Sequence, residues 1–172
     1  MADETLRERQ APIKARYRDD PAAARFTLRA EGTLDGEGLT CKVATGKGPA
    51  EAGLHPATGG DGLSLCSGDM LLEALVACAG VTLRAVASAL EIPIRGGTVR
   101  AEGDLDFRGT LAVSKEAPVG FRDVRLHFQI DSDATEEQMA TLLKLTERYC
   151  VIYQTLRTPP ALSAAIGADD RT

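Results

Sequence analysis

The sequence lacks a surplus of positive charge. Of its 172 residues, 20 are Lys or Arg and 25 are Asp or Glu, which gives a formal net charge of −5 at pH 7. Proteins that bind nucleic acid need basic residues to neutralise phosphates. Nucleic acid is therefore not an expected partner.

An apolar run long enough to cross a membrane is also missing. The longest run, residues 70–79, contains Glu73, and Arg84 interrupts the wider segment, whereas a membrane-spanning helix needs about 20 predominantly apolar residues. The first ten residues, MADETLRERQ, contain no apolar segment of the kind found in secretory signals. We therefore expect a cytoplasmic protein that does not bind membranes.

Clustered metal ligands are absent from the sequence as well. The four cysteines, at positions 41, 66, 78 and 150, form no CxxC pair, and the two histidines stand apart from each other. A structural zinc site usually shows closely spaced ligands. We therefore predict no metal and no other cofactor.

Length and composition favour a single domain. A chain of 172 residues can bury one ordinary core but not two, and its content of 44% hydrophobic and 26% charged residues is normal for a globular protein. We assign residues 25–165 to this domain. Residues 1–24 predict an N-terminal arm or short helix, and residues 166–172 predict a loose C-terminal tail.

The pattern after the N-terminal arm predicts a hairpin and then a loop. Apolar and polar residues alternate over 26–33 and over 39–43, with the turn residues LDGEG between them. This arrangement places Cys41 on the inner face of the hairpin. Residues 46–62 are rich in glycine and proline and predict a long loop that contains His55.

The most apolar segment predicts a long central helix. Ser67 is expected to cap it, Asp69 lies in its first turn, and it should end near Leu90. Its apolar residues form two neighbouring stripes at helical spacing: Leu72, Val76, Ala79, Leu83, Val86 and Leu90, and Leu71, Leu75, Cys78, Thr82 and Ala85. One small domain cannot cover so much apolar surface, so we expect a subunit interface on this helix.

The remaining pattern predicts two strands and a second helix. Residues 99–107 and 124–130 alternate as antiparallel strands with one wet face, which carries His127 as a solvated side chain. The segment DSDATEEQ contains two capping-box spacings, Asp133 to Glu136 and Thr135 to Gln138, and so predicts a helix start. The apolar positions of this helix are Met139, Leu142, Leu143, Thr146, Tyr149 and Cys150. Cys150 should lie on its buried face or at a break near it.

Each cysteine is first expected to act as a small buried hydrophobe. Cys41 and Cys66 fit this interpretation best, although a helix start such as the one beside Cys66 can lower a thiol pKa. Cys78 and Cys150 lie on the inward faces of the two helices and meet if those helices pack together. Core filling, a structural bridge and a redox pair all remain open for these two residues.

Two segments resemble motifs of the OsmC/Ohr family of hydroperoxide reductases. CSGDMLLEALVACAGVTL resembles the central-helix motif, in which an ALxAC segment carries the peroxidatic cysteine, and ERYCVIYQTL resembles the second cysteine motif. The resemblance runs from about residue 26 to residue 160. It implies an α+β, OsmC-like two-layer fold, with antiparallel sheets packed around a long buried central helix. It also implies an intertwined homodimer with active sites at the subunit boundary.

The same resemblance implies an activity. Carried over residue by residue, Cys78 matches the peroxidatic thiol and Cys150 the resolving thiol. Family members reduce organic hydroperoxides in oxidative stress: a thiolate attacks the peroxide, the sulfenic acid condenses with the second cysteine, and a dithiol reductant resets the disulfide. An apolar pocket around Cys78 would suit a fatty or aromatic hydroperoxide.

The sequence departs from the family at the groups that activate the thiol. In the family, an arginine of the N-terminal hairpin is held by a glutamate ten residues before the first cysteine, whereas this chain has Leu34 and Gly68 at these places. Asp69 or Glu73 is the candidate acid. The candidate cations are Arg29, Arg25 and Arg18. After the second cysteine, Val151 stands in place of a common proline, and Tyr153 and Gln154 replace smaller residues.

Two other functions therefore remain open. One is a non-enzymatic module on the same fold that binds a hydrophobic ligand or senses redox state, which the missing arginine and glutamate favour. The other is group transfer or hydrolysis with Cys78 as nucleophile. That chemistry needs a nearby base, and His127 on a wet strand cannot supply one, so it would require the loop with His55 to fold over the site.

Overall fold

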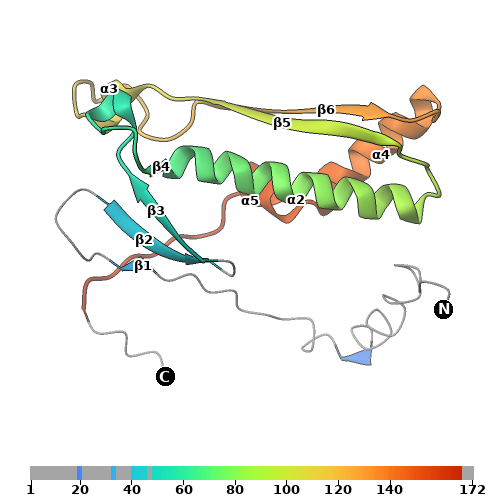
Figure 1. Cartoon of the computed structure of the whole chain (residues 1–172), viewed down its shortest axis with the longest axis horizontal. Helices are drawn as coiled ribbons and strands as arrows, with labels where there is room; N and C mark the ends of the chain where they lie inside the picture. The colour runs from blue at the N-terminus through green and yellow to red at the C-terminus, as the bar shows by residue number, and fades with distance from the viewer. Residues whose placement is uncertain (1–18, 21–31, 34–39, 46–47, 168–172) are drawn as a thin grey trace.

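A computed structural model describes residues 19–20, 32–33, 40–45 and 48–167, with the backbone alone for 32–33 and 40–45. Its central element is the long helix α2 (Ser67–Ala89). Figure 1 shows two paired strands, β5 (Gly96–Asp104) and β6 (Asp123–Asp131), running along α2. The helices α4 (Glu136–Tyr149) and α5 (Val151–Arg157) also pack on α2. The predicted α+β class, with a long central helix against strands, is confirmed.

Four strands near the start of the chain form a second sheet in the order β1-β2-β3-β4. They are β1 (Gly32–Thr33), β2 (Thr40–Thr45), β3 (Gly48–Gly53) and β4 (Leu65–Cys66). The antiparallel pairing of β1 with β2 confirms the hairpin where it is described, and residues 26–31 and 34–39 lie outside the described residues. The prediction of a continuous loop over 46–62 is wrong, because β3 pairs with β2 at six positions from Thr40↔Gly53 to Thr45↔Gly48.

The helix α2 lies where the apolar pattern predicts it, but its cap differs. Cys66, not Ser67, is the N-cap residue, and no side chain caps the first turn. The cause is the strand β4, in which Cys66 has an extended backbone and pairs with Gly53. The chain therefore passes directly from a strand into the helix.

Within one chain, α2 is covered on only part of its circumference. Its buried residues are Leu75, Ala79, Leu83, Val86 and Ala87. In contrast, Val81 is 73% exposed and Leu71 is 37% exposed, so a single chain leaves part of this apolar helix uncovered. The helix α2 is long and apolar enough to cross a membrane. The core helix of a folded domain can meet the same criteria of length and composition.

The strands β5 and β6 alternate as predicted. They pair antiparallel from Gly96↔Asp131 to Asp104↔Asp123, and His127 is exposed on the outer face. The expected strand end at residue 107 is wrong, because the short helix α3 (Phe107–Thr110) begins there. The Asp106 side chain caps α3 by accepting a hydrogen bond from the Arg108 N–H.

The second helix is interrupted at Cys150. Thr135 and Gln138 form the predicted capping box of α4. Cys150 has an extended backbone (φ −73°, ψ 110°) and serves both as the last cap of α4 and the first cap of α5. This arrangement confirms the second of the two predicted positions, a break near the buried face.

Two residues predicted for the buried face of α4 are exposed. Leu143 is 43% exposed and Tyr149 is 59% exposed, whereas Leu142 is fully buried. Leu142 and Thr146, the buried residues of α4, are spaced by four and lie on the side that packs on α2, and residue 143 is turned by about 100° from Leu142. The helical pattern contained more apolar positions than α2 can cover.

The described core consists of two clusters along α2. One, near the end of α2, joins Leu83, Val86, Ala87, Ile92 and Leu142. The other, near its middle, joins Leu75, Ala79 and Cys150, with Cys78 packed against them. The second cluster thus brings together two cysteines that lie far apart in the sequence.

Candidate functional site

Cys78 and Cys150 meet inside the second cluster. Cys78 lies in the middle of α2 and is half-buried, and Cys150 is 1% exposed at the break between α4 and α5. The Cys150 thiol lies close enough to Cys78 to lower its pKa. Leu75 and Ala79, both buried, pack around the pair. The structure therefore places the two sequence-predicted cysteines together.

Local structure explains why these thiols face each other. On α2, Leu75, Cys78 and Thr82 recur at intervals of three and four and so lie on one face. The extended backbone at Cys150 restarts the chain as α5. Because the first amides of a helix have no partner within the helix, the N–H groups of Val151 and Ile152 are available to a neighbouring sulfur.

These donors favour the ionised form of Cys78. Burial of the sulfur raises the thiol pKa, but hydrogen bonds from the backbone of Ile152, from the Cys150 thiol, from the backbone of Val151 and from the Thr82 side chain outweigh burial, and the pKa of Cys78 is lowered. A thiolate is the nucleophilic form of cysteine. Cys78 is therefore the more reactive thiol of the pair.

Cys150 has the opposite tendency. Burial raises the pKa of its thiol, and the adjacent Cys78 raises the pKa further, although backbone hydrogen bonds from Tyr153 and Ile152 act against this. Cys150 thus keeps its proton when Cys78 is ionised and can donate it in the hydrogen bond between them. The environment assigns different states to two chemically identical side chains.

No described cation contributes to the lowered pKa of Cys78, whose described causes are hydrogen bonds alone. The candidate cations Arg18, Arg25 and Arg29, together with Leu34, lie outside the described residues. Within the described part of the chain, neutral donors alone favour the thiolate.

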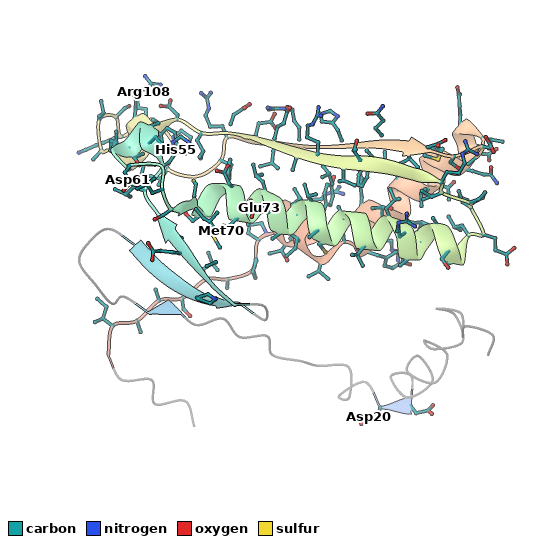
Figure 2. The ribbon with its side chains drawn as sticks, viewed as in Figure 1. Asp20, His55, Asp61, Met70, Glu73 and Arg108 are labelled. Carbon is teal, nitrogen blue, oxygen red and sulfur yellow. The ribbon has the colours of Figure 1, made fainter. Side chains whose placement is uncertain are left out.

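The candidate acids lie away from Cys78. At about 100° per residue, Asp69 is about 180° and Glu73 about 140° around α2 from Cys78. Both carboxylates are exposed and line a separate cavity of about 450 Å³ beside Ala101 of β5; Figure 2 labels Glu73 on the first half of the helix. Spacings of nine and five residues before Cys78 place these two acids on other faces of a helix, so the sequence alone could have predicted the separation.

The remaining candidates lie elsewhere. Cys66 is half-buried at the start of α2, and the backbone of Cys41 pairs with Ala52. The His55 Nδ1 accepts a hydrogen bond from the Ala57 N–H at 3.0 Å, and its ring stacks on Phe107 with centroids 5.1 Å apart. Figure 2 shows His55 beside α3, at the end of the molecule where α2 begins.

A cavity of about 580 Å³ lies between α2, β6 and α5, next to the cysteine cluster. Four of its lining residues also belong to the core cluster that contains Cys150 or pack against that cluster: Leu75, Val124, Leu126 and Tyr153. Its other lining residues include Phe121, Arg122 and Arg157, which sequence reasoning missed because no periodic pattern marks them. Cavities of this size and apolar character are typical of small-molecule sites.

Metal ligands do not gather in the parts of the chain that the structure describes. No group of three or more His, Cys, Asp or Glu side chains there is arranged to hold a metal ion.

The chain is similar to a known family and to several solved structures. A family model described as OsmC-like protein matches residues 59–164, and a search of curated proteins found no match. The fold is similar to an OsmC-like protein from Mycoplasma pneumoniae, with a TM-score of 0.65 and 17% identity over 78% of this chain and 89% of that one.

Two structures with functional names are also similar. An organic hydroperoxide resistance protein from Elizabethkingia anophelis has a TM-score of 0.63 and 19% identity over 79% of this chain and 91% of its own. The organic hydroperoxide resistance protein OsmC from Legionella pneumophila has a TM-score of 0.61 and 18% identity over 78% and 92%. At such identities the likeness shows the fold.

Proposed function

Because the chain belongs to the OsmC-like protein family, we propose that it reduces organic hydroperoxides to alcohols, with Cys78 as the attacking thiol and Cys150 as the resolving thiol. The observation that carries this proposal is the contact between the two thiols, one with a lowered and one with a raised pKa. Two relatives of the same fold are named organic hydroperoxide resistance proteins.

The proposed reaction begins at the Cys78 thiolate. Its sulfur attacks the terminal peroxide oxygen, the O–O bond breaks, and the alkoxide takes up a proton and leaves as the alcohol. Cys78 is thereby oxidised to a sulfenic acid while the peroxide is reduced. The amides of Val151 and Ile152 stabilise the thiolate before attack.

The second step closes a disulfide. The Cys150 sulfur attacks the sulfenic sulfur of Cys78, and the hydroxyl group leaves as water. An external dithiol then reduces this disulfide by thiol–disulfide exchange and becomes oxidised itself. Such a reductant is expected in the cytoplasm.

The experiment is a disulfide map after a single oxidation. Fully reduced protein is mixed with one equivalent of cumene hydroperoxide, and intact mass should fall by about 2 Da through loss of two hydrogens, located in a Cys78–Cys150 bridge. Cys150→Ser should leave a Cys78 sulfenic acid that reacts with dimedone. Cys66→Ser is the control and should behave as the parent protein. A Cys78 thiol that stays free over minutes would refute the proposal.

We also propose a homodimer, as the family resemblance implies. Exposed apolar surface on α2, most of all Val81 at 73%, favours a covering subunit because large apolar surfaces mark interfaces. Figure 1 shows β5 and β6 along one side of α2 only. Analytical ultracentrifugation at micromolar concentration should give twice the mass of one chain, and a single-chain mass would contradict the dimer.

A binding module without turnover is the second candidate. It is favoured by the cavity of about 580 Å³ beside the cysteine cluster and by the absence of any described cation acting on Cys78. Native mass spectrometry after mild purification separates the two functions. A retained hydrophobic molecule together with no hydroperoxide turnover would favour binding alone.

A further inference from the structure

The cavity between α2, β6 and α5 carries two arginines on otherwise mostly apolar walls. Arg122 directly precedes β6, and Arg157 is the last residue of α5. Both side chains are exposed. Neither guanidinium forms a side-chain hydrogen bond or ion pair with another residue in the described part of the chain. Two cations thus face one cavity without a described partner.

The carboxylate that lines the same cavity is already paired. Asp123 accepts a hydrogen bond from Nη1 of Arg125 at 2.8 Å. Arg122 acts on Asp104 and Asp106 only at longer range, since their pKa values are lowered mainly by hydrogen bonds from Arg125 and from Arg108, respectively. Arg125 also pairs with Glu102 and Asp104, so Arg122 and Arg157 are the lining cations that have no ion pair among the described residues.

The apolar wall opposite this charge leads toward the thiols. Leu75 and Tyr153 line the cavity and also pack in the cysteine cluster. Phe121 forms another part of the wall. Its ring lies over Gly103, where an added Cβ would come within 2.5 Å of the ring. The cavity therefore combines an apolar wall, shared with the core cluster that contains Cys150, with two arginines in its lining.

We infer that this cavity binds an amphipathic molecule with one anionic end, and that Arg122 and Arg157 select that end. A carboxylate is the simplest such group, because guanidinium groups bind carboxylates through paired hydrogen bonds. The apolar body of the ligand would lie against Leu75, one layer of side chains from the cysteine pair. Where the ligand is a hydroperoxide, the inference rests on the proposed function.

Binding without any peroxide tests the charge selection by itself. Calorimetry with decanoate and with decan-1-ol, each below its aggregation limit, compares two ligands with the same chain and different ends. Arg122→Gln and Arg157→Gln should each weaken decanoate binding about five-fold, equivalent to about 1 kcal/mol for an exposed charge pair. Binding of decan-1-ol should not change. Arg100→Gln, an equal loss of charge on the outer face of β5, is the matched control and should change neither ligand.

Measurements of turnover then test whether Arg122 and Arg157 also make the enzyme prefer anionic hydroperoxides. For the double variant Arg122→Gln/Arg157→Gln, kcat/KM for linoleic acid hydroperoxide should fall about 25-fold relative to its methyl ester, because additive free energies multiply the two five-fold effects. Turnover of cumene hydroperoxide, which has no anionic end, should stay the same.

The outcomes distinguish the two proposals. If no hydroperoxide is turned over but decanoate binding depends on both arginines, the proposed function fails and the charge selection stands. The inference is overturned if the parent protein binds decanoate no more tightly than decan-1-ol, or if the arginine variants weaken both ligands equally.

Discussion

Replacing Gly103 by alanine should destabilise the protein by forcing Phe121 out of place. A Cβ at Gly103 would lie 2.5 Å from Cε1 and 2.6 Å from Cδ1 of the Phe121 ring. Carbon atoms in contact normally stand about 3.5–4.0 Å apart. The ring, or the strand beneath it, must therefore move by about 1 Å.

The magnitude follows from two opposing effects. Overpacking of this kind costs about 1–3 kcal/mol, whereas the lower entropy of the unfolded chain with alanine offsets about 0.4–1 kcal/mol. We expect Gly103→Ala to lower the free energy of unfolding by about 1.3 kcal/mol, with limits of about 0 and 2.6 kcal/mol. Gly96, at the start of the same strand, is the matched control, because a Cβ there meets no atom within 4 Å. Gly96→Ala should leave stability unchanged or raise it by up to about 1 kcal/mol.

Urea denaturation followed by far-ultraviolet circular dichroism measures both variants. A second measurement identifies the cause: in a Phe121→Leu background, the penalty of Gly103→Ala should shrink, since directly coupled residues are not additive. Because Phe121 lines the cavity, Gly103→Ala should also weaken decanoate binding, and Gly96→Ala should not. Equal effects of the two glycine substitutions, or an unchanged penalty without the Phe121 ring, would refute the reasoning.

Three further changes test the core, the helix cap and the thiol pair. Leu142→Ala should cost about 2–5 kcal/mol because its side chain is fully buried, whereas Leu143→Ala, at a 43% exposed position, should cost under about 1 kcal/mol in the same urea assay. Thr135→Ala removes the capping box of α4 and should cost about 1 kcal/mol; a loss no larger than that of Leu143→Ala would contradict the cap. Because the pKa of Cys78 is lowered and that of Cys150 raised, alkylation of Cys78 by iodoacetamide should persist to lower pH than alkylation of Cys150. Cys150→Ala removes a donor and should shift the Cys78 profile to higher pH more than Cys150→Ser, so identical profiles in these two variants would count against the donor.

Much of the fold could be predicted because burial repeats along the chain. The two apolar stripes of α2, the alternation of β5 and β6 and the capping box at Thr135 are local patterns that depend on helix and strand geometry alone. The cap at Cys66 and the strand β3 could not be found in this way. Both depend on backbone pairing between Cys66 and Gly53 and between β2 and β3, which the composition of a glycine-rich segment does not reveal.

The candidate site was also predictable only in part. Motif spacing singled out Cys78 and Cys150, and helical periodicity placed both on inward faces. Helix geometry could have predicted that Asp69 and Glu73 lie away from Cys78. The motif resemblance considers only how many residues separate an acid from the cysteine, and so it does not show on which face of the helix the acid lies. The cavity with Arg122 and Arg157 had no local signal, because a residue before a strand and a residue at a helix end come together only through packing.

The sequence by itself determined the periodic elements, the α+β class and the identity of the two thiols. Only the tertiary structure decided that the helix breaks at Cys150, that the amides of Val151 and Ile152 face Cys78, and that two arginines share one cavity. The physical reason is that periodicity reports which side of an element is buried but not what buries it. Hydrogen bonds to a thiolate and the charge around a cavity depend on residues distant in the chain, and packing alone sets their partners.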